Sequence, residues 1–393
     1  MLGTEQHSSL PSTPTLAWGL IENLLNKGHE ISIITNTHKF LPKNVYPLKK
    51  VQIYPMISST DSLLEYAASL FKSTTTIVSQ IKKINPDVVH TYGDITMSYF
   101  TAILKNQTKK PSITTVTRNW VGYGYPRAVV RMLSLGGWDL QTYTILNNIK
   151  RQLIFSLDHI ICCNNFVKKQ IVGNRKVSKN ISVLPYGIKK AFLSQSDPDI
   201  SNVPKSEGKT ILYWGDGNYV RGYYIFLFSI AKVLKLFPKT RFIAAIRGIE
   251  DLDSVKLRIT AKKIEKTCSN LQIFNKALEP NSLVRLIDSS QIIALPFIIN
   301  AMEPPLTIIE SMALGKPVIT TKIGGNNEII SNMENGILIE PNSSQLSEAI
   351  ISLLKNDSKS GQIGQRAYET IREQYNWDKC TKKVLEIYKK VVN

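Results

Sequence analysis

Two carboxylates, Glu303 and Glu310, flank the expected start of a helix. Pro304 and Pro305 suit a first helical turn, and the apolar residues after them recur at helical spacing. We therefore predict a helix that begins just after Glu303 and ends at Gly315. At its position in such a helix, Glu310 can accept hydrogen bonds from both hydroxyls of a ribose, and Glu303 can meet a sugar hydroxyl. An acid near a helix start also simply complements the helix dipole, so the surroundings must decide.

Two expected strands position this helix. Residues 292–296 form an apolar run before it, and residues 317–320 form another after a tight connection. A helix that starts directly after a parallel strand directs its unpaired N–H groups outward at the carboxyl edge of the sheet. This arrangement favours a diphosphate site, with Leu306 and Thr307 in the first turn.

The segment from Glu303 to Gly325 resembles the signature of retaining glycosyltransferases of family 4, which have the GT-B fold. That signature has a Glu, seven residues, a second Glu, then Ala-Met-Ala-x-Gly-x-Pro-Val-Ile and a Gly-Gly turn. The match from Glu310 onward is close, but six residues separate the two acids here. Because Glu303 precedes the helix, the missing residue shortens the loop without rotating the helix face. The resemblance implies a catalytic role for Glu303 and a donor-binding role for Glu310.

The resemblance extends to a loop that follows an expected strand at residues 210–214. Gly-Asp-Gly-Asn-Tyr-Val-Arg-Gly, which begins at Gly215, is similar to the family's Gly-Arg-Leu-x-x-x-Lys-Gly, with Arg221 in place of the lysine. Arg221 is expected to neutralise the donor diphosphate, since a guanidinium binds phosphate oxygens in pairs. Asp216 stands where the family has a second cation. Two lysines are candidates to restore that charge: Lys322, and Lys276 in the turn where the family's backbone holds the nucleotide base.

The first half of the chain resembles the family less closely. A short strand is predicted at residues 86–90, and it ends in His90, where the family often has a histidine facing the cleft. A lone histidine at a strand end is also commonly structural. Thr117 occupies the position of a second, catalytically useful histidine of the family. Arg118 follows it and could bind an anionic acceptor or remain solvated.

Basic and aromatic side chains alternate along residues 118–155, where Asp139 is the only acid. This composition favours a membrane interface or a lipid-phosphate acceptor, and an ordinary pair of amphipathic helices fits it equally well. The residues assigned to the acceptor or membrane side are Arg118, Trp120, Arg127 and Arg131.

The start of the chain departs from the family pattern. Residues 1–12 are polar, a helix is predicted from there to Gly28, and residues 30–35 alternate as in a strand. The family's first strand and most of its Gly-rich loop are missing before that helix. We expect either a start farther upstream or a trimmed gene, with a gap in the first sheet.

The composition is that of a globular protein with two domains. The chain has 393 residues, of which 43% are hydrophobic. No apolar run reaches the ~18 residues of a membrane span, and no signal peptide is recognisable, so we expect a cytoplasmic protein. The four cysteines lack paired metal-ligand spacing, and we predict no metal.

The formal net charge is +19, and residues 1–200 hold 23 Lys and Arg against 11 Asp and Glu. Such a balance suits an anionic membrane surface, a nucleic acid or a polyphosphate substrate. No recognition helix or RNA motif is recognisable, so nucleic acid is not an expected partner.

These observations predict an α/β protein of the GT-B type, with two Rossmann-like, doubly wound domains facing across a cleft. Residues 1–190 form the acceptor-side domain, 191–209 a linker, 210–374 the nucleotide-sugar domain, and 375–393 a helix returning to the first domain. The resemblance implies retaining transfer of a hexose from a UDP- or GDP-linked donor to a hydroxyl of a glycolipid, lipid-linked oligosaccharide or polysaccharide. It implies no cofactor, because the nucleotide-sugar is a substrate. The alternative is a non-catalytic GT-B protein that acts as a binding or scaffold partner of an active transferase.

Overall fold

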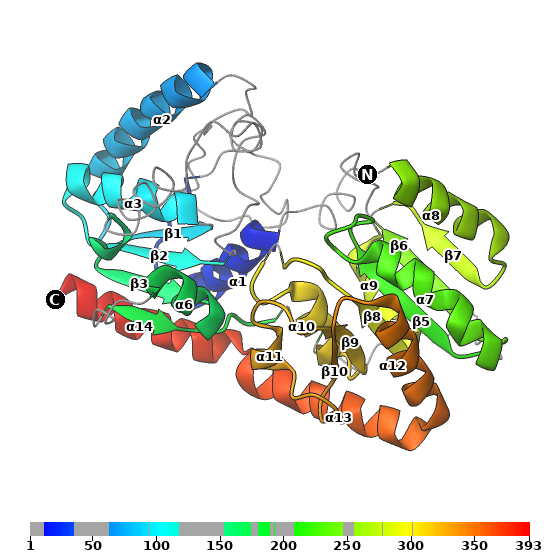
Figure 1. Ribbon diagram of the computed structural model, residues 1–393. Coiled ribbons are helices and arrows are strands. Elements are labelled where there is room, and N and C mark those ends of the chain that lie inside the picture. The colour runs from blue at the N-terminus through cyan, green and yellow to red at the C-terminus, as the bar shows by residue number, and fades with distance from the viewer. Residues whose placement is uncertain are drawn as a thin grey trace, which may run out of the picture. The chain divides into compact units, whose positions relative to one another are not determined.

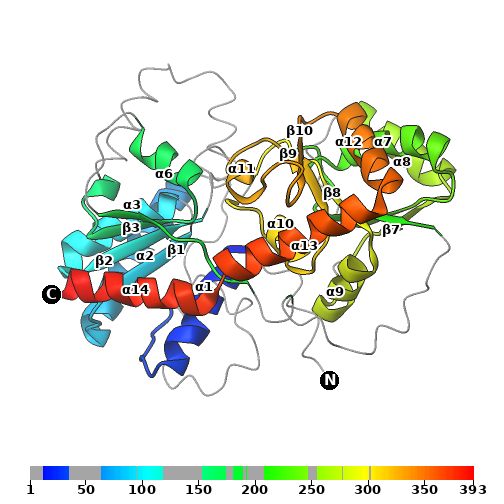
Figure 2. The same cartoon turned by 90° about the horizontal axis from the view of Figure 1, so that it is seen from below.

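The computed structural model describes residues 12–34, 63–93, 95–117, 153–173, 180–188, 192, 208–246, 255–276, 278–300 and 302–393. They form two compact units, each containing one sheet with helices packed around it (Figures 1 and 2). One unit combines the described residues from 12 to 186 with residues 377–393, and the other lies within residues 187–376. Every strand pair described in the two sheets is parallel, and the predicted α/β class is confirmed.

The N-terminal unit contains four described strands in the order β1-β2-β3-β4. They are β1 (Val89–Gly93), β2 (Ser112–Val116), β3 (His159–Cys162) and β4 (Ile181–Val183). Every residue of β2 and β3 is buried, as expected for the centre of a parallel sheet with both faces covered.

Helices cover both faces of this sheet. They are α1 (Ser12–Asn26), α2 (Leu63–Ile84), α3 (Ile95–Thr108), α6 (Asn165–Val172) and α14 (Trp377–Val392). Ile160 of β3 shares a core cluster with α3 and α6, while Ile161 points to the other face and shares one with α1 and α14. The last helix of the chain therefore completes the core of the N-terminal unit (Figure 1).

Two strand predictions in this unit need correction. Residues 29–34 form no strand, although Ile31 and Ile34 pack against the core, because an alternating pattern can bury side chains without its backbone joining a ladder. The strand predicted to end at His90 continues to Gly93, because Tyr92 and Gly93 still pair with β2. His90 therefore lies near the amino end of β1.

The C-terminal unit contains six described strands in the order β10-β9-β8-β5-β6-β7. They are β5 (Thr210–Gly215), β6 (Arg241–Ile246), β7 (Leu271–Phe274), β8 (Ile292–Leu295), β9 (Val318–Thr321) and β10 (Ile337–Ile339). The chain starts at β5, runs outward to β7, and returns to β8 on the other side of β5. The strand order thus reverses between β5 and β8, and ligands of open α/β sheets bind at the carboxyl ends of strands at such a reversal.

The helices of the C-terminal unit form two layers. They are α7 (Tyr223–Leu236), α8 (Val255–Thr267), α9 (Pro280–Ser289), α10 (Leu306–Ala313), α11 (Asn326–Ile329), α12 (Ser343–Lys355) and α13 (Asp357–Gln374). Figure 2 shows α7, α8 and α12 on one side of the sheet, and α9, α10 and α13 on the other.

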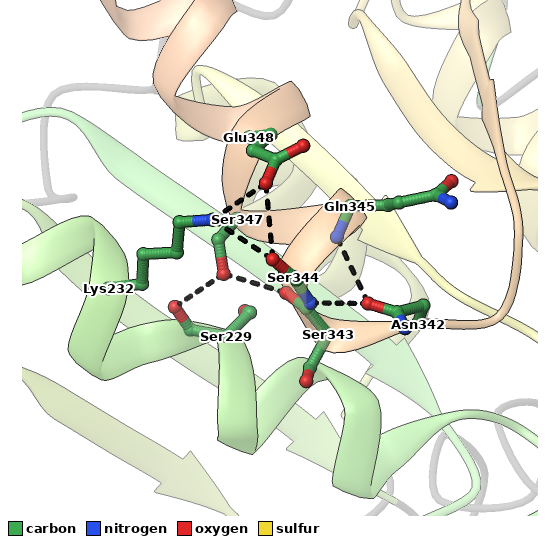
Figure 3. Close-up of polar contacts among 8 residues, drawn as sticks. All are labelled: Ser229, Lys232, Asn342, Ser343, Ser344, Gln345, Ser347 and Glu348. Carbon is green, nitrogen blue, oxygen red and sulfur yellow. Dashed lines mark hydrogen bonds and ion pairs between the residues drawn. The ribbon is translucent and has the colours of Figure 1, made fainter.

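Polar contacts fix α12 to α7, as Figure 3 shows. Asn342 caps α12, because its Oδ1 accepts hydrogen bonds from the backbone N–H groups of Ser344 and Gln345. Lys232 of α7 donates to Ser344 Oγ over 2.9 Å and lies 2.7 Å from Glu348 Oε1. These contacts lie beside the apolar interface that α7 and α12 share.

Candidate active site

The loops after β5 and β8 contact each other where the strand order reverses. The backbone N–H groups of Ile298 and Ile299 both donate to the carbonyl oxygen of Val220, over 2.9 and 3.0 Å. Gly222 has a φ of +77°, and a Cβ there would overlap the carbonyl oxygen of Pro296. Only glycine lets the backbone of the loop after β5 come this close to Pro296, so Gly222 is required for the contact between the two loops.

Arg221 lies in the contact between these two loops. Its side chain is 8% exposed, and its Cζ lies 4.1 Å from the ring centroid of Phe297. A Cβ on Gly215 would stand 3.9 Å from Arg221 Nη2, so the guanidinium lies beside the carboxyl end of β5. A permanent positive charge held at a strand-order reversal suits an anionic ligand.

Glu303 is fully buried and connects the loop after β8 to the turn after β9. Its Oε2 accepts a hydrogen bond from the backbone N–H of Gly325 over 3.0 Å, and its Oε1 accepts one from Asn300 Nδ2 over 3.2 Å. Gly324 has a φ of +53°, and a Cβ there would overlap Glu303 Oε1. Glu303 therefore shapes the Gly-Gly turn, and its predicted contact with a reacting sugar stays a prediction.

Asn300 and Asn326 are buried residues of this site that the sequence analysis did not single out. Asn300 Nδ2 donates to Asn326 Oδ1 over 2.8 Å, and Asn326 Nδ2 donates to the carbonyl oxygen of Thr321 over 2.9 Å. The only signal in the sequence was their position, three residues before Glu303 and directly after the Gly-Gly turn.

The helix α10 begins at Leu306, two residues later than predicted, because Pro305 is its extended N-cap and not part of its first turn. Thr307, Glu310 and Ser311 share one of its faces. Trp214 Nε1, at the end of β5, donates to Ser311 Oγ over 3.0 Å, so this face lies against β5. Glu310 is 8% exposed. Within the described residues, Asn300 Oδ1 and Thr307 Oγ1 are buried oxygens that lack a hydrogen-bond partner.

Comparison with known sequences identifies the chain. Residues 14–192 match the family model described as Glycosyltransferase Family 4, and residues 196–370 match that of Glycosyl transferases group 1. The chain belongs to glycosyltransferase family 4. One relative of this glycosyltransferase, an uncharacterized glycosyltransferase of Methanocaldococcus jannaschii, is 23% identical over 94% of this chain and 93% of its own length.

Solved structures share the fold of this glycosyltransferase. A glycosyltransferase from Rickettsia africae has a TM-score of 0.72 at 21% identity, covering 98% of this chain and 97% of that one. HepE of Anabaena, crystallised with UDP-glucose, has a TM-score of 0.73 at 14% identity, covering 97% of each chain. The predicted family and the GT-B fold are confirmed, and the enzyme is a glycosyltransferase.

Two further residues were expected to affect the charge of the donor site. Lys276 is exposed directly after β7, which is two strands from β5 in the sheet. Asp216 is half-buried, and its carbonyl oxygen accepts a hydrogen bond from Tyr213 over 2.6 Å. Their roles toward a nucleotide stay predictions.

His90 belongs to the N-terminal unit, where both ring nitrogens have partners. Nδ1 lies 2.6 Å from the Tyr388 hydroxyl, and Nε2 lies 2.7 Å from Thr115 Oγ1. Burial, assisted by the charge of nearby His159, lowers the pKa of His90 to about 3, so the ring is neutral at physiological pH. These contacts are structural, and the catalytic role predicted for His90 remains untested. The acceptor-side residues Arg118, Trp120, Arg127 and Arg131 lie outside the described residues.

The described part of the chain holds no group of three or more His, Cys, Asp or Glu residues arranged to bind a metal ion. None of its described helices is long and apolar enough to cross a membrane. Burial raises the pKa of Cys162 and of Cys380 to about 12, so both remain thiols at neutral pH.

Proposed function

We propose that this enzyme transfers a hexose, with retention of anomeric configuration, from a UDP- or GDP-linked donor to an acceptor hydroxyl. The acceptor is a glycolipid, a lipid-linked oligosaccharide or a polysaccharide. The observation that carries the donor site is that two buried oxygens of the segment after β8, Asn300 Oδ1 and Thr307 Oγ1, lack a hydrogen-bond partner within the described residues. Buried polar atoms are rarely left unpaired in folded proteins, and ligand sites are common exceptions.

The donor's parts are assigned to residues by their chemistry. The diphosphate lies at the start of α10 and against Arg221, which together stabilise the charge that develops on the leaving group. Glu310 accepts hydrogen bonds from the ribose hydroxyls. The Anabaena protein of the same fold binds UDP-glucose, which supports a nucleotide-sugar donor for this chain.

Retention is supported by the family to which the chain belongs. Glu303 accepts one hydrogen bond on each carboxylate oxygen, from Asn300 Nδ2 and from the backbone N–H of Gly325. Its part in our proposal is to hold the Gly-Gly turn against the donor sugar.

The acceptor class rests on charge. The first 200 residues carry most of the excess of Lys and Arg, which favours an acceptor with phosphate groups at an anionic membrane surface. Cosedimentation with vesicles tests this part: binding should rise with the fraction of anionic lipid, and binding that ignores that fraction would contradict it.

Isothermal titration tests the donor site. The chain should bind UDP and UDP-glucose, or GDP and GDP-mannose, and Glu310→Gln should weaken the nucleotide about tenfold through lost charge-assisted hydrogen bonds. Glu334→Gln, which alters an exposed carboxylate of the same unit, is the matched control and should bind like the parent. Parent-like binding by Glu310→Gln would show that the donor site is misplaced.

A further inference from the structure

We infer that Asn300 recognises one hydroxyl of the donor hexose through its side-chain oxygen. The inference rests on the proposed function and adds to it a residue that discriminates between sugars. It assigns Glu303 and Asn326 the task of orienting that oxygen.

The orientation of the Asn300 amide is determined by its neighbours. Asn326 Nδ2 donates to the backbone carbonyl of Thr321, which can only accept, so Asn326 presents Oδ1 to Asn300. Asn300 must therefore offer its NH₂ group to Asn326. The same NH₂ group also donates to Glu303 Oε1. A flipped Asn300 amide would place its oxygen against two other acceptors, Asn326 Oδ1 and Glu303 Oε1.

The two hydrogens of Asn300 Nδ2 are thus both used, and its Oδ1 is left as an acceptor of fixed direction. Asn300 is 2% exposed, and its Oδ1 has no hydrogen-bond partner in the described part of the chain. Leaving such an atom unsatisfied is costly, and only a donor group can satisfy it. A hexose hydroxyl is such a donor, whereas the phosphate oxygens of the nucleotide are acceptors at neutral pH.

The loop that carries Asn300 also lies where the sugar end of the donor is expected. A Cβ on Gly324 would stand 2.8 Å from Asn300 Nδ2, so this amide lies directly against the Gly-Gly turn. Phe297, three residues earlier, stacks with the diphosphate-binding candidate Arg221. One short loop therefore carries both the amide that lies against the turn and the ring that contacts Arg221.

Discrimination between sugars follows from burial. A site that hydrogen-bonds a substrate hydroxyl rejects the analogue lacking it, because the buried partner is then left unpaired. Loss of the hydroxyl that Asn300 binds should therefore lower the affinity for the donor, and Asn300 should not affect the cost of losing any other hydroxyl.

The test is titration of the parent and of three variants with UDP, UDP-glucose and UDP-glucose analogues that each lack one hexose hydroxyl, or with the GDP-mannose set if the chain binds GDP. For the parent, removal of one particular hydroxyl should weaken binding about tenfold more than removal of any other. In Asn300→Ser this extra penalty should disappear, whatever the variant's overall affinity. Asn300→Asp loses both hydrogens that orient the amide and places carboxylate oxygen against Asn326 Oδ1 and Glu303 Oε1, so it should also lose the penalty.

Asn335→Ser is the matched control. Asn335 is a buried asparagine of the same unit whose Oδ1 accepts from Ser331 N and whose Nδ2 donates to Ile329 O and Thr370 Oγ1, so its loss should leave the penalty intact. Equal penalties in the parent and in Asn300→Ser would overturn the inference while leaving the donor site standing. A parent that binds no nucleoside diphosphate would overturn the proposed function together with the inference.

Discussion

His90 Nδ1 lies 2.6 Å from the hydroxyl oxygen of Tyr388, so a strand near the start of the fold is joined to the last helix of the chain. The other ring nitrogen contacts Thr115 of the neighbouring strand. One imidazole therefore ties β1, β2 and α14 together, and it does so in the neutral form. Protonation would turn the acceptor nitrogen into a second donor inside a buried cluster.

The stability of the N-terminal unit should therefore depend on pH through His90. The unfolded chain protonates this ring below pH 6.5 and the folded unit only near pH 3, so the free energy of unfolding falls as the pH is lowered between these values. His90→Gln should flatten that dependence in calorimetric melts. His29→Gln, at an exposed position, should keep the parent's dependence, and an unchanged slope in His90→Gln would contradict the assignment.

Replacement of Gly324 by alanine should impair donor binding. The new Cβ would overlap Glu303 Oε1 and displace the carboxylate that holds the turn. The substitution also strains a backbone of positive φ, at a cost of about 1–2 kcal/mol. Gly315→Ala is the matched control, since its φ is +70° but the nearest atom to its Cβ lies at 3.8 Å. Both variants should melt earlier, and only Gly324→Ala should bind nucleotide-sugar more weakly by titration.

Substitution of Arg221 should weaken the binding of the nucleoside diphosphate much more than the binding of the free nucleoside. Arg221→Gln should weaken UDP or GDP on the order of 10- to 100-fold, as expected for the loss of charge-assisted hydrogen bonds, and leave the free nucleoside nearly unaffected. Arg221→Lys keeps the charge but loses the stacking on Phe297, and it should fall between Arg221→Gln and the parent. Arg285→Gln, on an exposed part of α9, serves as the control. If Arg221→Gln weakened the nucleoside and the nucleoside diphosphate equally, Arg221 would not contact the diphosphate.

Much of the fold could be predicted because its strands are short apolar runs between turn residues. The predicted strands at 210–214 and 292–296 match β5 and β8 to within one residue at their ends. The end of β1 was missed because it is set by pairing with β2, and Thr91, Tyr92 and Gly93 carry no apolar signal of their own. The length of a strand depends on the neighbouring strand with which it pairs, so the sequence of one strand alone does not determine where that strand ends.

The charged residues of the candidate site could be predicted from the sequence, whereas its buried asparagines could not. Arg221, Glu303 and Glu310 stood out because they are the charged residues of segments that resemble the family's motifs, and the structure shows that all three are buried. Asn300 and Asn326 escaped notice because their hydrogen bond joins two loops 26 residues apart. Asparagine in a loop usually serves the turn itself, and only the folded structure distinguishes the two roles.

The return of α14 to the N-terminal unit has a consequence for biosynthesis. Residues 187–376 are contiguous, so the ribosome delivers that unit complete before it makes the last helix. The N-terminal unit can complete its core only after α14 has been made, because Cys380 and Val384 of α14 share a core cluster with Leu20 and Leu24 of α1. The apolar surface of α1, in the unit that is translated first, therefore stays uncovered until then.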